Sequence, residues 1–196
     1  MKLPCLQQLA AVMAFALSVF GAHDVGATSV LPLDLDQIVA NAKDIVHVRC
    51  TGNEVQRDAA VGIVTVTTFV VLDRAKGGEG STFTVRQAGG ELDGVAVNYR
   101  LPTFAVGDEY VLFMPPASRL GLASPVGLSQ GAFAVLPGRA GKEVGNGRDF
   151  SQLLSTKDRT NARASIAARL QLAPSERTRV KLDDFMTLLR EKAATR

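Results

Sequence analysis

Six short strand-like runs between residues 45 and 136 limit the fold more than any other feature of the sequence. They cover about 45–52, 62–75, 82–86, 95–101, 110–114 and 131–136. β-Branched and aromatic residues alternate with polar ones in these runs, and turn-forming glycine, aspartate and proline separate them. A parallel sheet would need a helix between successive strands. We therefore predict a mainly β fold with added helices (α+β), built on a small, closed or nearly closed antiparallel barrel of the OB-like kind.

Two of these runs carry further local signals. At Phe69–Leu72 the alternation stops and both faces of the strand become apolar, which predicts either cover by another element or a β-bulge. Asp93-Gly94 precedes the fourth run and is typical of a two-residue hairpin turn.

Helices are predicted at both ends of the strand-rich region. Asp34 and Gln37 have the spacing of a capping box, and apolar residues at helical intervals follow them over 35–42. Near the C-terminus, residues 182–192 form an amphipathic pattern with acidic residues first and basic residues last, which suits the helix macrodipole. A weaker helical pattern covers 161–172 and ends before Pro174.

The first 27 residues have the three parts of a secretory signal. Lys2 precedes an apolar run over 9–20, and Val25-Gly26-Ala27 fits a small-residue cleavage site. The run is shorter than the roughly 20 apolar residues that span a bilayer. We predict that residues 1–27 are a signal peptide and that the protein is exported, to the periplasm or beyond the cell.

Charge divides the remaining chain into two parts. Residues 28–147 hold 10 basic and 12 acidic side chains, whereas residues 148–196 hold 11 and 6. This predicts a β-barrel domain over 28–147 and a basic helical extension over 148–196. Such an extension suits another exported protein or an anionic envelope component; nucleic acid is not expected in that compartment, and a merely solvated helical face is the alternative.

Catalytic residues are few after removal of the signal. Cys50 and His47 are then the only cysteine and histidine, which excludes an internal disulfide and constrains a Ser/His/Asp triad. Cys50 shares its strand face with valines, so it is predicted to be buried, and His47 points to the other face. No metal or cofactor motif is present, and we expect no cofactor.

Carboxylates are the remaining candidates for chemistry. They occur as close pairs at predicted caps and turns, where capping and turn formation explain them: Asp34 with Asp36, Glu91 with Asp93, and Asp108 with Glu109. We assign no catalytic residue, and Asp108 and Glu109 are the pair that a carboxylate-dependent hydrolase would use.

Two resemblances follow from particular motifs. Residues 42–52, and Thr65–Leu72 with Lys76-Gly77, resemble the opening of netrin-like and tissue-inhibitor-of-metalloproteinase domains, whose fold is an OB-type barrel. The motifs Gly89-Gly90-Glu91, 104–113 and 126–131 resemble an uncharacterised family of secreted bacterial proteins over about residues 32–136. The first resemblance implies a barrel and protein binding. It does not extend to zinc chelation by an amino-terminal cysteine, because this chain would begin at Thr28.

Together these observations favour an exported, non-catalytic binding module that engages another envelope or secreted protein. The alternatives are a carboxylate-dependent hydrolase and a carrier that holds a small ligand in the barrel mouth.

Overall fold

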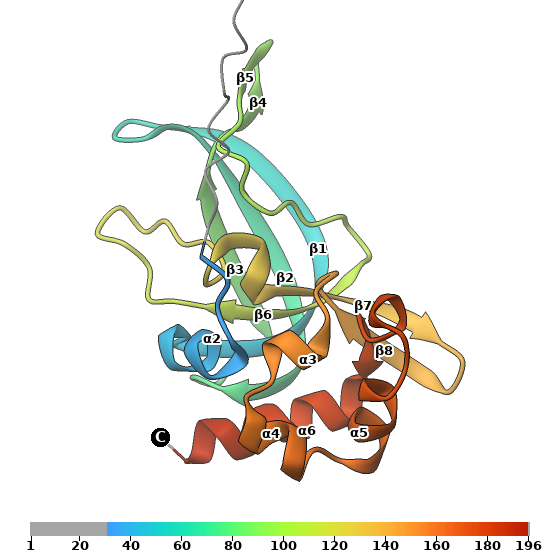
Figure 1. The fold of residues 1–196 in the computed structure, drawn as a ribbon. Coiled ribbons are helices and arrows are strands. Elements are labelled where there is room, and N and C mark those ends of the chain that lie inside the picture. Colours follow the sequence, from blue (N-terminus) through green and yellow to red (C-terminus); the bar gives the residue numbers. More distant parts are fainter. Residues whose placement is uncertain (1–30, 196) are drawn as a thin grey trace, which may run out of the picture. The chain divides into compact units, whose positions relative to one another are not determined.

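A seven-stranded antiparallel sheet is the centre of the computed structural model, which describes residues 31–195 (Figure 1). The predicted signal peptide, residues 1–27, lies outside this described part. The sheet has the order β3-β2-β1-β6-β7-β8-β9, and β4 pairs with β5 in a separate two-stranded sheet. The strands are β1 (Asp44–Asp58), β2 (Gly62–Lys76), β3 (Thr82–Ala88), β4 (Gly90–Leu92), β5 (Val95–Val97), β6 (Glu109–Met114), β7 (Ala132–Gly138), β8 (Gly141–Gly145) and β9 (Val180–Lys181).

Helices precede and follow the strands. They are α2 (Leu35–Asn41), α3 (Phe150–Leu153), α4 (Thr156–Asn161), α5 (Ala164–Leu170) and α6 (Leu182–Ala194), with 3-10 turns η1 (Leu128–Gly131) and η2 (Pro174–Glu176). Figure 1 shows α3 to α6 gathered on one side of the sheet, away from the β4–β5 hairpin. Within residues 31–195, no helix combines the length and the apolar character needed to cross a membrane.

The α+β class is confirmed, but the sheet is not closed into a barrel. Strands β3 and β9 are its edges, and no pairing joins them among the described strands. The segment that was expected to be the fourth strand, 95–101, pairs only over Val95–Val97. Beyond it Arg100 has a positive φ of 57° and Pro102 follows, so this chain does not continue as a strand.

The long hairpin of β1 and β2 explains the doubly apolar run at Phe69–Leu72. The pairing register of β1 with β2 shifts three times, including between His47 and Val48, whose partners Asp73 and Val71 leave Leu72 unpaired within this run. Val70 and Leu72 are 42% and 39% exposed, so no element covers them. Of the two explanations that the sequence left open, the bulge is the one found.

The sheet buries a different hydrophobic cluster on each face. On one face, here called the pocket face, Cys50, Phe69, Val85 and Leu112 pack around Phe104, which lies in the loop between β5 and β6. The other, here called the helix face, packs residues such as Phe113 and Phe133 against the helices. Because β1 and β6 lie at the centre of the sheet, both of their faces are buried, as Ile45 and Val46 illustrate.

The C-terminal segment is part of this helix-face core. Phe150 and Phe185 are fully buried, and their rings pack with Phe133 at centroid distances of 6.3 and 5.2 Å. Strand β9 extends the sheet by pairing with β8. This segment belongs to the same compact unit as the strands, Pro32–Arg196.

Strand β8 is not predicted from the sequence, because glycines make the β7–β8 hairpin look like a loop. Residues 138–147 look like a polar loop, yet Gly141–Gly145 is β8. A Cβ atom at Gly145 would clash with the carbonyl oxygen of Thr178. This glycine marks a close approach between two backbones. The predicted helix over 161–172 is found as the shorter α5, and α4 precedes it.

Candidate functional site

A pocket of about 370 Å³ opens on the pocket face beside the β4–β5 hairpin, and we call it the hairpin pocket. Its polar lining includes Asn53, Thr65, Thr67 and Gln87, and its apolar lining includes Val97, Tyr99, Leu101, Pro102 and Phe104. The volume lies within the range of small-molecule sites in proteins, and so does the combination of apolar walls with a few polar groups.

The pocket forms where the pocket face changes from apolar to polar. Within β2 the inward residue changes from Phe69 to Thr67, and within β3 it changes from Val85 to Gln87. Residues two apart in a strand share a face, so the two changes lie side by side on paired strands. Thr67 and Gln87 are only 2% and 6% exposed. Two strands thus place buried polar side chains where apolar ones would extend the core.

These polar groups are fixed by neighbours but retain bonding capacity. The Thr67 hydroxyl donates to Asn53 Oδ1 at 2.7 Å, and Asn53 Nδ2 donates to the Phe104 carbonyl oxygen at 2.8 Å. Gln87 Nε2 donates to Ser124 Oγ over a longer 3.3 Å. An amide carries two N–H donors and two acceptor sites. Gln87 can therefore offer both a donor and an acceptor to a bound molecule.

Glycine allows the hairpin to lie close to the sheet and form the pocket wall. Gly90 has a φ of 134°, and a Cβ atom there would lie 2.7 Å from Thr65 Oγ1 and 2.8 Å from Val55 Cγ1. Any side chain at this position would lift the hairpin away. At the outer lip Tyr99 remains 60% exposed.

The predicted carboxylate pairs do not converge on the hairpin pocket. Asp34 caps α2 through the expected box with Gln37, and Asp93 forms the hairpin turn and pairs with Arg57 at 3.0 Å. Of these carboxylates only Glu91 lines the hairpin pocket.

Asp108 and Glu109 both line a second hollow of about 460 Å³, next to the β7–β8 hairpin. Burial acts to raise the pKa of Glu109, but hydrogen bonds from Lys142, Arg49 and His47 outweigh it and lower that pKa to about 2. Lys142 Nζ lies 2.6 Å from Glu109 Oε2, and Arg49 Nη2 lies 2.7 Å from Oε1. Glu109 is thus a neutralised structural carboxylate, and at ordinary pH it has no proton to give as a general acid.

Cys50 and His47 lie on opposite faces of β1, as predicted. Cys50 is 1% exposed, and burial raises the pKa of its thiol, with a further contribution from Asp108 against a lowering hydrogen bond to Gly52. His47 Nε2 lies 2.9 Å from Glu109 Oε2 on the helix-face side. A buried thiol with a raised pKa is a poor nucleophile. Neither residue touches the hairpin pocket.

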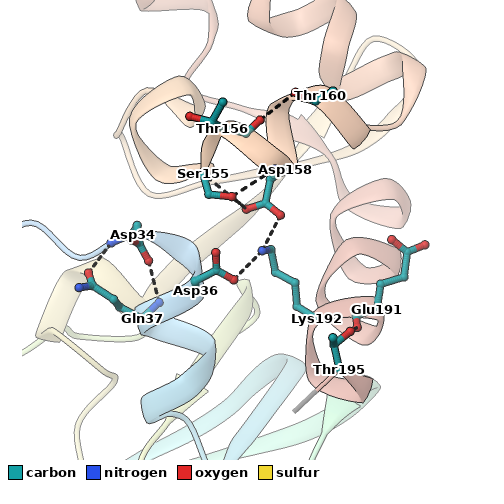
Figure 2. A network of polar contacts seen from close by, with 10 residues as sticks. All are labelled: Asp34, Asp36, Gln37, Ser155, Thr156, Asp158, Thr160, Glu191, Lys192 and Thr195. Carbon is teal, nitrogen blue, oxygen red and sulfur yellow. Dashed lines mark hydrogen bonds and ion pairs between the residues drawn. The ribbon is translucent and has the colours of Figure 1, made fainter.

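Several basic side chains of residues 148–196 form ion pairs with acidic residues of the same chain. Arg169 pairs with Glu143, and Arg190 pairs with Asp73. Lys192 Nζ lies 2.7 Å from Asp36 Oδ1 and 2.6 Å from Asp158 Oδ1, as Figure 2 shows. The acidic body and the basic tail are therefore complementary surfaces of one domain.

The network in Figure 2 joins three segments that are far apart in the sequence. Asp36 comes from α2, Asp158 from α4 and Lys192 from α6. Burial acts to lower the pKa of Lys192, but hydrogen bonds to Asp158 and Asp36 outweigh it and raise that pKa. The Lys192 side chain is only 9% exposed. Its contacts hold α2, α4 and α6 together, which is a structural task.

The comparisons with known proteins give no family for the chain. No protein-family model matches it, and no curated protein matches it.

Proposed function

We propose that this chain is an exported, non-catalytic binding module whose binding site is the hairpin pocket. The observation that carries the proposal is the placement of Thr67 and Gln87, two buried polar side chains, in an otherwise apolar recess. Burying a polar group costs free energy unless it gains hydrogen bonds. Thr67 and Gln87 have partners in Asn53 and Ser124, and their remaining bonding capacity is available to a ligand in the recess.

The charge of the pocket restricts what it would bind. Among the described residues that line the pocket, Glu91 is the one that carries a charge. An anion would meet this carboxylate without a compensating cation in the lining. The proposal therefore names a neutral or cationic ligand with an apolar body and a carbonyl or amide group.

The proposal includes export and a relation to the OB-type barrel. Export is supported by the signal pattern of residues 1–27. A relation to the OB-type barrel is supported by the antiparallel pairing of β1 with β2 and β6 and of β2 with β3. The OB fold is itself a partly open barrel, so an open edge is compatible with it.

A titration with prodan, a neutral naphthyl ketone whose emission shifts to the blue in apolar surroundings, tests the proposal. The chain has no tryptophan, so a new indole acts only where it is placed. Val97→Trp would fill the pocket from its half-buried wall, and we expect at least a tenfold loss of prodan affinity, about 1.4 kcal/mol.

Leu172→Trp is the matched control, because Leu172 is 42% exposed and is not part of the pocket lining. It should bind prodan as the parent chain does. Equal affinity in all three proteins, or no blue shift in the parent, would refute the hairpin pocket as a binding site. Circular dichroism and the thermal midpoint verify that each variant is folded.

A further inference from the structure

Strand β5 lies beside the hairpin pocket, and one of its edges has no pairing partner among the described strands. Strand β5 pairs with β4 on one side, and no other described strand pairs with it. Asp93 and Gly94 both have positive φ, 53° and 76°, which makes the connection a tight two-residue turn of the I′ type. In such a hairpin the residues next to the turn bond to each other, and the next pair faces outward. Ala96 therefore directs its backbone N–H and C=O to the free edge.

The side chains around this edge are apolar and accessible. Val95 is 52% exposed and Tyr99 is 60% exposed, while Ala96 between them is also exposed. An exposed apolar edge strand is a template for pairing with another extended chain. Its position beside the pocket adds side-chain selectivity, because Ala96, Val97 and Tyr99 all line the pocket.

Resting on the proposed function, we infer that the hairpin pocket and the free edge of β5 together bind an extended polypeptide segment. The segment adds as a third strand to β4–β5 through the backbone of Ala96. One apolar side chain of the segment enters the pocket, where its neighbouring peptide group meets Gln87. Strand addition of this kind takes its affinity from main-chain hydrogen bonds and its specificity from side-chain pockets.

The charge of the lining selects the kind of segment. Glu91 is exposed on β4, and Asp93 is 69% exposed on its side chain at the turn, where Arg57 pairs with it. A neutral or basic segment meets the Glu91 carboxylate favourably, whereas an acidic segment is repelled. A short edge provides few hydrogen bonds, so we expect micromolar rather than nanomolar binding.

A competition experiment on the full chain tests this inference. The probe is a blocked synthetic peptide of alternating valine and threonine with lysine at each end, and displacement of prodan reports its binding. We expect the same peptide with N-methyl groups on alternate residues to bind at least tenfold more weakly, because it cannot form the strand. Replacement of its lysines by glutamate should also weaken it.

Two variants of the chain place the effect on the edge of β5. Ala96→Pro removes the outward N–H and should weaken the peptide at least tenfold. Because Ala96 also lines the pocket, the prodan affinity of each variant is measured first, and the competition by the peptide is expressed relative to it. Ala96→Ser keeps the N–H and should behave as the parent does.

The outcomes separate this inference from the proposed function. If prodan binds but the unmodified and N-methylated peptides compete equally, or if neither peptide competes, strand addition is refuted and the pocket proposal stands. If prodan itself fails to bind, the proposed function fails. A dimer that forms through β5 without peptide, and that Ala96→Pro abolishes, would replace the peptide by a second copy of the chain.

Discussion

Substitution of Lys192 by methionine tests whether the C-terminal helix is locked to the rest of the domain by its ion pairs. Methionine keeps most of the aliphatic stem and removes only the ammonium group that contacts Asp36 and Asp158. The Asp158 side chain, 11% exposed, would then hold a charge with only Ser155 to solvate it. The variant therefore removes an attraction and leaves a poorly solvated carboxylate.

The magnitude follows from the burial of the three groups. Exposed ion pairs contribute about 0–1 kcal/mol, and breaking a fully buried pair costs about 3–5 kcal/mol. Lys192 and Asp158 are nearly buried, but Asp36 is 36% exposed. We expect a loss of about 2 kcal/mol in the free energy of unfolding. For a domain of this size that lowers the thermal midpoint by about 4–8 °C.

Thermal and urea unfolding followed by circular dichroism measure this loss. Lys157→Met is the matched control, because Lys157 is exposed in the same region and forms no ion pair in the described structure. It should change stability by less than about 0.5 kcal/mol. In the double variant Lys192→Met/Asp158→Asn, part of the loss should be recovered. If Lys192→Met and Lys157→Met change stability equally, the network in Figure 2 does not stabilise the domain.

Three further predictions address the other features of the domain. The pKa of Glu109 is depressed from 4.5 to about 2, so its contribution to stability is present above about pH 4.5 and is lost as the pH falls towards 2. Glu109→Gln should lower the free energy of unfolding by about 1–2 kcal/mol near neutral pH. This is less than the pKa shift alone implies, because solvent screens the half-exposed Arg49 and Lys142. In urea titrations at acid pH, the difference from the parent chain should vanish. A difference that persists at pH 2 would contradict the ion-pair explanation. The Cys50 thiol should resist a thiol-specific disulfide reagent in the native chain and react in denaturant, as peptide mass spectrometry of the Cys50 fragment would show; rapid native labelling would argue against its burial. A chain that stops after Gly147 loses Phe150, Ile166 and Phe185 from the helix-face core, each worth about 1.5–3 kcal/mol, and should not fold cooperatively, whereas a sharp calorimetric transition would show that residues 148–196 are an independent extension.

Local patterns in the sequence predicted the elements whose formation is a local matter. The capping box at Asp34 predicted the start of α2, and the turn at Asp93-Gly94 predicted the β4–β5 hairpin. Alternation in β1 correctly placed Cys50 in the core. These features depend on residues within a few positions of one another, where turn chemistry and side-chain period apply directly.

Features that depend on distant contacts are not predictable from local patterns. Sequence inspection alone indicates a loop at Gly145, because its close neighbour, Thr178, lies more than thirty positions away. The basic charge of residues 148–196 predicts an outside partner, and this stays a prediction; within the chain, several of these cations pair with Glu143, Asp73 and Asp36. A charge imbalance along the sequence does not reveal which of its parts will touch.

Almost nothing in the sequence predicts the hairpin pocket. Threonine is common in strands, so Thr65 and Thr67 do not indicate that their hydroxyl groups line a pocket. Gln87 lies two residues after Val85, and this step from apolar to polar on one strand face is the one signal that inspection could have used. This step becomes a pocket only because the β4–β5 hairpin lies beside it, and the sequence does not predict that placement.

The side-chain amide of Gln87 provides the most direct test of the hairpin pocket. In a nitrogen-15 correlation spectrum, its resonances should shift progressively as prodan is added, together with the backbone signals of Val97 and Tyr99. Signals from α6 should stay in place. Shifts confined to α4 and α6, with the Gln87 resonances unchanged, would contradict binding in the hairpin pocket and place the binding site at the C-terminal helices.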